Sequence, residues 1–278
     1  MKFHAKLAVQ PNKKVRLKDF DPSETYGYER GHHKGERDEI LMEKTLARLD
    51  ELQYLLYAEG KRSLLVVLQG MDTAGKDGTI RHVMSGASPQ SCKVTSFKAP
   101  TAVERNHDFL WRIHQAAPEK GQIMIFNRSQ YEDVLVVRVH KMVPKEVWKE
   151  RYSEINRFEK YLTENGTTVL KFFLHISKEE QKRRIEARLS DPAKHWKISE
   201  ADLQERKFWG DYIEAYEDAL SECSTKYAPW FIIPADHKWF RNLAVSKIIV
   251  ETLEKMDPKY PKPQVDIAKM KRLLNSKK

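Results

Sequence analysis

Cysteine is scarce in this chain of 278 residues, which contains only Cys92 and Cys223. Two cysteines are too few for a disulfide framework, and their separation fits no metal-binding spacing. Long apolar runs are also missing, because no stretch approaches the length of about eighteen residues that a membrane span requires. No signal peptide is recognisable either. We therefore expect a soluble, cytoplasmic protein.

Acidic residues are outnumbered, with 40 Asp and Glu against 50 Lys and Arg, and the net charge is +10. Such a surplus favours a polyanionic partner: nucleic acid, a phosphorylated metabolite or a phosphate polymer. A generally basic surface has the same composition, so charge alone does not choose among these. Apolar residues come in bounded runs although 32% of the chain is charged, which indicates a globular protein.

Residues 63–79, SLLVVLQGMDTAGKDGT, combine a strand pattern, a glycine-bounded loop and the start of a helix. The run Leu64–Leu68 is long enough for a strand that is buried on both faces. The template G-x-x-x-x-G-K-[ST] is met at Gly70, Gly75 and Lys76. Because the loop follows a strand and precedes a helix, it predicts a phosphate-binding P-loop. A flexible turn is the alternative interpretation.

Within this loop we expect backbone N–H groups to cradle phosphate oxygens and Lys76 to contact bridging or terminal oxygens. Asp72 would repel phosphate unless a hard cation lies between them, although a loop-shaping hydrogen bond is the alternative. The position after the lysine, normally Ser or Thr, is Asp77. The other residues expected to bind phosphate are Gly70, Met71, Thr73, Ala74, Gly75, Gly78 and Thr79.

Strand and helix patterns alternate along the chain. Strands are expected at 64–68, 92–97, 122–126, 168–176 and 228–235, and helices at 36–58, 101–116, 145–165, 178–189, 200–220 and 239–255. This alternation predicts an α/β fold with a parallel five-stranded sheet covered on both faces. We expect an N-terminal arm (1–35), a single domain (36–258) and a frayed tail (259–278).

Polar residues follow the third predicted strand, at the edge where ligands bind in open α/β sheets. Arg128 can clamp a phosphate bidentately. A metal-ordering acid often occupies the position held here by Asn127, a neutral group. Glu132 and Asp133 follow within one turn of a predicted helix and can supply the missing carboxylate. An ordinary helix N-terminus that favours acidic residues is the alternative.

The segment 182–197 is strongly basic and is interrupted at Asp191-Pro192. It is either a solvated helix face or part of a helical lid, over about 178–220, that closes arginines over transferred phosphates. Trp196 lies between basic residues and either covers a base or phosphate or packs internally.

Four segments, GMDTAGKDG, FNRSQYEDV, KHWK and APWFIIPAD, resemble the polyphosphate kinase 2 family over nearly the whole chain from residue 36. The resemblance implies a three-layer P-loop sandwich of the thymidylate-kinase type with a helical lid. It also implies reversible phosphoryl transfer between inorganic polyphosphate and nucleotides, with Mg²⁺, or Mn²⁺ as a substitute. A homodimer or homotetramer, without nucleic-acid or membrane partners, is expected.

Carried over residue by residue, the resemblance places the family's loop aspartate and lysine at Asp72 and Lys76, its strand-end arginine at Arg128, and its lid arginines at Arg184 and Arg188. The residues expected to be catalytic are Asp72, Lys76, Arg128, Glu132, Asp133 and Arg184. Magnesium is expected on Asp72 and Asp133. The remaining expected phosphate or nucleotide contacts are Asn127, Arg188, Lys194, Trp196 and Lys197. In this family the P-loop side receives polyphosphate.

Asn127, followed by Tyr131, Glu132 and Asp133, resembles the third class of the family, which phosphorylates both AMP and ADP and so makes ATP from AMP. Glu132 is expected to help accommodate AMP as well as ADP.

Two other functions compete with this interpretation. An ATP-dependent nucleoside monophosphate kinase would share the fold and the lid, but Ser or Thr rather than Asp77 would follow the P-loop lysine. A non-catalytic, basic nucleic-acid-binding protein would fit the charge. However, no recognised nucleic-acid motif is present.

Overall fold

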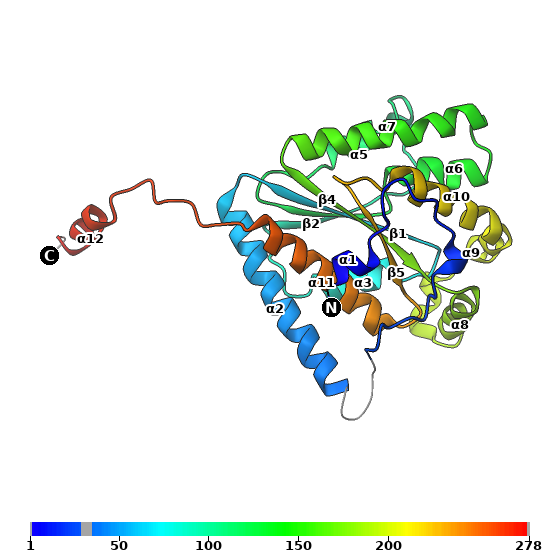
Figure 1. Ribbon diagram of the computed structural model, residues 1–278, viewed down its shortest axis with the longest axis horizontal. Coiled ribbons are helices and arrows are strands. Elements are labelled where there is room, and N and C mark those ends of the chain that lie inside the picture. The colour runs from blue at the N-terminus through cyan, green and yellow to red at the C-terminus, as the bar shows by residue number, and fades with distance from the viewer. Residues whose placement is uncertain (1, 29–34, 277–278) are drawn as a thin grey trace.

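The computed structural model describes residues 2–28 and 35–276. One parallel sheet has the strand order β2-β3-β1-β4-β5. Its strands are β1 (Ser63–Gly70), β2 (Cys92–Ser96), β3 (Ile123–Asn127), β4 (Thr167–His175) and β5 (Trp230–Pro234). Helices cover both faces, giving three layers (Figure 1). The predicted α/β class and all five strands are confirmed.

The two cores follow from the alternation of side chains along the buried strands. Leu64, Val66 and Leu68 of β1 point to one face, and Leu65 and Val67 point to the other. The first face packs against α1 (Phe3–Leu7), α2 (Gly35–Glu59), α3 (Lys76–Val83) and α11 (Lys238–Met256). The second packs against α5 (Trp111–Gln115), α6 (Val136–Val139), α7 (Lys145–Glu164) and α10 (Trp209–Cys223).

The helix expected over 101–116 is wrong as a single element. Thr101 caps a short α4 (Ala102–Arg105) through a capping box with Glu104, and α5 begins only at Trp111. Between them, Asp108 accepts hydrogen bonds from the backbone N–H groups of Leu110 and Trp111, which starts a new turn.

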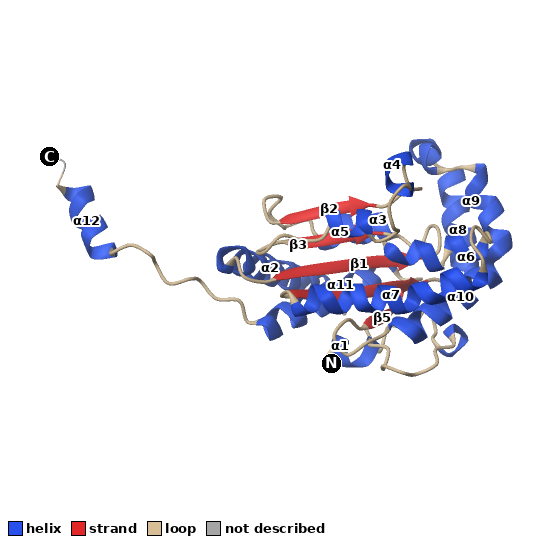
Figure 2. Cartoon of the chain, turned by 90° about the horizontal axis from the view of Figure 1, so that it is seen from above, coloured by secondary structure: helices blue, strands red, loops and turns tan. Residues whose placement is uncertain are grey.

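The basic segment is also more divided than predicted. Helix α8 (Lys178–Leu189) is followed by η3 (Pro192–Lys197), α9 (Glu200–Glu205) and η4 (Arg206–Phe208) before α10 begins. These elements lie at the end of the sheet to which the strands point (Figure 2). A lid placed there would cover the carboxyl ends of the strands, where the P-loop lies.

The two ends of the chain behave differently. In the N-terminal arm, α1 is followed by η1 (Leu17–Asp19). The arm is bound to the domain by hydrogen bonds from the Val9 N–H to the carbonyl of Trp230, the first residue of β5, and from the Phe3 N–H to Glu251. Residues 29–34 of the predicted arm lie outside the described residues. The tail carries α12 (Ile267–Asn275), which stands away from the domain (Figure 1), so part of the tail that was expected to be frayed is helical. Within the described residues, no helix is apolar and long enough to cross a membrane.

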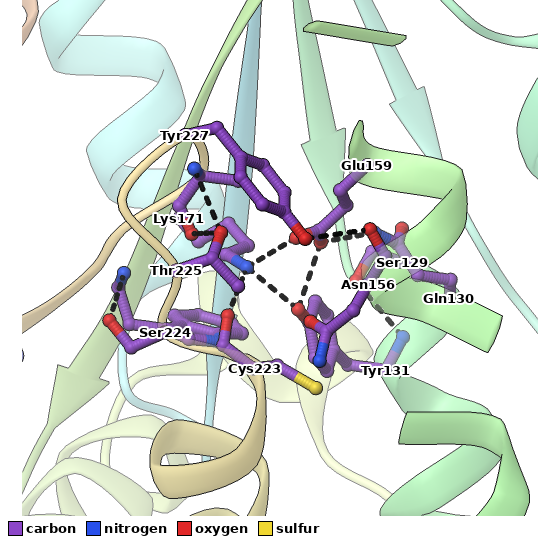
Figure 3. A network of polar contacts seen from close by, with 12 residues as sticks. Ser129, Gln130, Tyr131, Asn156, Glu159, Lys171, Cys223, Ser224, Thr225 and Tyr227 are labelled. Atoms are coloured by element: carbon purple, nitrogen blue, oxygen red, sulfur yellow. Dashed lines mark hydrogen bonds and ion pairs between the residues drawn. The ribbon is translucent and has the colours of Figure 1, made fainter. Parts of the chain in front are cut away.

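A charged side chain, Lys171, lies in the middle of β4 and is fully buried. Its ammonium forms an ion pair with Glu159 of α7 and donates to the Tyr131 hydroxyl (2.9 Å) and the Cys223 carbonyl (2.7 Å) (Figure 3). Glu159 also accepts from Tyr131 (2.8 Å) and Gln130 (3.0 Å). All three ammonium N–H donors are therefore satisfied, and the network joins β4, α7, the end of α10 and η2 (Gln130–Val134).

This network predicts a non-additive mutant cycle. Lys171→Met or Glu159→Met alone leaves one buried charge without its partner and should cost about 3–5 kcal/mol of unfolding free energy. The double variant removes both charges and should recover at least half of the loss of the worse single variant. Urea unfolding followed by circular dichroism measures this, and additive losses would contradict it.

Candidate functional site

The predicted P-loop spans the end of β1 and the start of α3. Gly75 precedes α3 with φ +102°, a backbone conformation that favours glycine. The Lys76 ammonium donates to the carbonyls of Gly70 (2.8 Å) and Met71 (3.3 Å) and so folds back across the loop. Burial lowers the pKa of Lys76, and Asp72 opposes that effect. The loop thus carries a half-buried cation at the place where phosphate would bind.

The end of β3 lies beside this loop because β1 and β3 are paired, with Leu68 opposite Asn127. Arg128, with φ +63°, donates from Nη2 to Oδ1 of Asp72 at 3.1 Å. Asn127 donates from Nδ2 to Oδ1 of Asp77 at 2.6 Å. The structure therefore brings together the predicted residues of the loop and of the strand end. In this conformation Asp77, which replaces the usual Ser or Thr, bonds to Asn127.

A large basic cavity of about 820 Å³ opens from the P-loop. Ten of its lining residues are Lys or Arg and three are Asp or Glu. The basic ones are Lys76, Lys98, Arg128, Arg183, Arg184, Arg188, Lys194, Lys197, Lys238 and Arg241. Low-dielectric walls with one sign of charge concentrate anions, so this cavity is suited to a phosphate chain.

A smaller cavity of about 280 Å³ lies on the other side of the loop. Its walls include Glu132 and three aromatic side chains, Trp209, Tyr212 and Tyr216. Asp72 and Arg128 line both cavities, so their ion pair marks the boundary between the two. This arrangement allows one ligand on each side of a single polar boundary.

Glu132 and Asp133, predicted together, face different surroundings. Glu132 accepts from Gln69 Nε2 at 3.1 Å and lines the smaller cavity. Asp133 accepts from Arg151 of α7 at 3.0 Å and lines neither cavity. Burial raises the pKa of Asp133 to about 6, although Arg151 acts in the opposite direction. The structure therefore does not bring Asp133 together with Asp72.

Arg184, which was predicted to be catalytic, binds the backbone of the P-loop. Its guanidinium donates to the carbonyls of Thr73, Ala74, Ala235 and Asp236 and to Glu180. All five N–H donors are used, so in this conformation Arg184 anchors the P-loop and has none left for a phosphate.

The other lid residues that were predicted to contact phosphate or nucleotide do not all lie at a cavity. Arg188, Lys194 and Lys197 line the larger cavity. Trp196 is 78% exposed beneath the Lys197 ammonium and lines neither cavity. Sequence reasoning missed Trp209, which lies at the smaller cavity, and Arg241, which lies at the larger one. No local motif distinguished these residues from packing residues.

The parallel sheet, the P-loop and the two cavities that meet beside it define the class of P-loop phosphotransferases. The family model for polyphosphate kinase 2 matches residues 32–261, and the chain belongs to this family. It is 51% identical to the AMP/ADP-polyphosphate phosphotransferase of Meiothermus ruber, over 93% of this chain and 96% of that protein. It is 49% identical to the ADP-polyphosphate phosphotransferase of Rhodopseudomonas palustris, over 80% of this chain and 81% of that protein.

A solved structure supports the same assignment. Polyphosphate kinase 2 from Arthrobacter aurescens TC1 superimposes with a TM-score of 0.93 at 43% identity, covering 99% of this chain and 97% of that one. The expected family and its fold are thereby confirmed.

Asp133 provides a prediction of pH-dependent stability. Its folded pKa of about 6 lies above the usual 3.8, so the folded state holds this proton more tightly than the unfolded state. As the pH rises from about 4 to about 6, the unfolding free energy of the wild-type protein should therefore fall relative to that of Asp133→Asn, by up to about 3 kcal/mol. Urea unfolding of both proteins across this range tests it. An Asp133→Asn protein less stable than wild type at pH 7 would show that the Arg151 pair outweighs burial.

Proposed function

We propose that this protein transfers the terminal phosphoryl group of inorganic polyphosphate to AMP and ADP, making ADP and ATP, in a reversible reaction. The observation that carries the proposal is that two cavities of different chemistry meet at one ion pair, Asp72–Arg128. The name of the Meiothermus ruber relative agrees with both acceptors.

The basic cavity is the proposed donor site. Polyphosphate carries about one negative charge per phosphate, and cationic walls both attract it and hold it in register. The P-loop end of this cavity provides Lys76 and the first turn of α3, which would bind the phosphate that is transferred.

The smaller cavity is the proposed acceptor site. Its aromatic residues Trp209 and Tyr212 offer apolar surface for a nucleobase, and Glu132 lies in the same cavity. We propose that Glu132 helps to accommodate AMP as well as ADP. The acceptor phosphate is already an anionic nucleophile, so the site requires positioning and charge stabilisation more than a strong base. Lys76 and Arg128 would stabilise the charge of the phosphoryl group in transit.

A divalent cation, Mg²⁺ with Mn²⁺ as a substitute, belongs to the proposal. Among the described residues, no group of three or more His, Cys, Asp or Glu side chains is placed so that it could hold a metal ion. Mg²⁺ is commonly held by one or two carboxylates together with substrate phosphates and water, so Asp72 at the boundary fits this mode. When bound, the cation would neutralise phosphate charge. Asp133 would have to leave Arg151 to take part.

The remaining parts of the proposal rest on the family resemblance. They are closure of the lid over about 178–220, assembly as a homodimer or homotetramer, and a cytoplasmic location without nucleic-acid or membrane partners.

The decisive experiment incubates purified protein with polyphosphate, Mg²⁺ and AMP or ADP, without added ATP, and separates the nucleotides by chromatography. We expect ADP and then ATP from AMP, and ATP from ADP. Lys76→Met should lower the rate by at least about 100-fold, because it removes a charge aimed at the transferring group. Phosphate transfer from ATP to a monophosphate, without any use of polyphosphate, would instead identify an ordinary nucleotide kinase.

The metal proposal predicts different behaviour for two aspartates. Chelation of divalent cations should abolish transfer, and Mg²⁺ should restore it. Asp72→Asn should raise the Mg²⁺ concentration for half-maximal rate by about tenfold or more, because it removes a carboxylate ligand. Asp133→Asn should leave that concentration unchanged. A shift in Asp133→Asn alone would reverse the assignment.

A further inference from the structure

Arg241 of α11 is a buried cation without an acidic partner. It is 3% exposed, and in the described part of the chain no carboxylate forms an ion pair with it. Its side chain nevertheless lines the large basic cavity. An uncompensated buried charge is costly, so its presence at a cavity requires a reason.

The hydrogen bonds of Arg241 are incomplete. Nε and Nη2 donate to Oδ1 of Asn242 (3.2 and 2.9 Å), and Nη1 donates to the Ala74 carbonyl (3.1 Å). Three of five N–H donors are engaged, which leaves two, whereas the neighbouring Arg184 uses all five. Burial lowers the pKa of Arg241 to about 9, and Arg184 acts in the same direction. Both observations indicate an environment that lacks an anion.

The P-loop is shaped to admit this guanidinium. A Cβ on Gly75 would collide with Nη1 of Arg241, and one on Gly78 would lie 3.5 Å from Nη2. Arg241 therefore lies against the first turn of α3, where backbone N–H groups and the helix dipole also favour an anion. Lys238, three residues earlier on α11, lines the same cavity.

We propose that Arg241 binds the donor phosphate chain directly and that its two remaining N–H groups donate to phosphate oxygens beside the P-loop. This inference rests on the proposed function, since it assigns a contact to the polyphosphate of that reaction. A bound phosphate would supply both the missing acceptors and the missing negative charge, in surroundings where charge-assisted bonds are strong.

The competing explanation is that Arg241 only supports the loop through Ala74. The two roles predict opposite changes in Arg241→Met. A supporting residue would lower the melting temperature of the ligand-free protein and leave polyphosphate binding intact. A ligand residue would leave ligand-free stability equal or higher, since replacing an unpaired buried charge by an apolar group is often neutral or favourable.

The experiment compares wild type, Arg241→Met and Arg241→Lys with the control Arg62→Met. Arg62 lies before β1, at the opposite end of that strand from the P-loop, and bonds to Glu59 and Met256. For each protein, KM values for polyphosphate and AMP are measured, together with the melting temperature with and without tripolyphosphate.

For Arg241→Met we expect the KM for polyphosphate to rise about tenfold or more, because charge-assisted bonds are lost, while the KM for AMP stays within about twofold. The stabilisation by tripolyphosphate should fall by at least half. Arg62→Met should keep both wild-type values. An unchanged KM for polyphosphate in Arg241→Met overturns the proposal.

Two further outcomes can be distinguished from a failure of the proposed contact. If Arg241→Met does not fold, Arg241→Lys decides, because it keeps the charge and loses the forked geometry. A KM for polyphosphate raised about threefold or more, at wild-type melting temperature, supports the contact, and an unchanged KM overturns it. If wild type itself makes no nucleotide product from polyphosphate, the proposed function fails independently of Arg241.

Discussion

The buried ion pair between Lys171 and Glu159 is the constraint on which the site depends. A charge in the central part of a strand is tolerated only with complete compensation, and here the compensation comes from three surrounding elements. One of them is η2, which begins two residues after Arg128, and another is the end of α10, whose first turns carry Trp209 and Tyr212. The end of β3 and the wall of the smaller cavity are thus connected to the same buried ion pair.

Around the P-loop, in contrast, some buried cations lack an anionic partner among the described residues. Arg184 is satisfied by carbonyls and Glu180, so it fixes the loop in place. Lys76 and Arg241 are half-buried or buried cations whose bonds go to carbonyls and an amide, without a strong anionic partner. A rigid loop surrounded by incompletely neutralised cations is preorganised for an anion, because little reorganisation is needed when the anion binds.

Sequence predicted the parts of this arrangement that local pattern controls. Continuous apolar runs located the strands, and the loop template located Lys76. The loop and the end of the third strand were both predicted at the ligand-binding edge of the sheet, but the contact between Asp72 and Arg128 was not predicted. The different directions of Glu132 and Asp133 were not predictable, because a tight 3₁₀ turn separates neighbouring side chains and only the tertiary partner Arg151 shows where one of them goes. Arg241 contacts Ala74 across 167 residues, and no local pattern reports such a contact.

If AMP and ADP are both acceptors, the two cavities must have different roles. In the proposed reaction, the transferred phosphoryl group would be held by the P-loop, which Arg184 anchors, and by the Asp72–Arg128 pair at the boundary of the cavities. An acceptor longer by one phosphate must therefore be accommodated on the other side, within the smaller cavity. That side is formed partly by α9 and η4, through Glu205 and Arg206, which belong to the predicted lid. The lid would then determine how long an acceptor can be, and the P-loop and α11 would bind the donor.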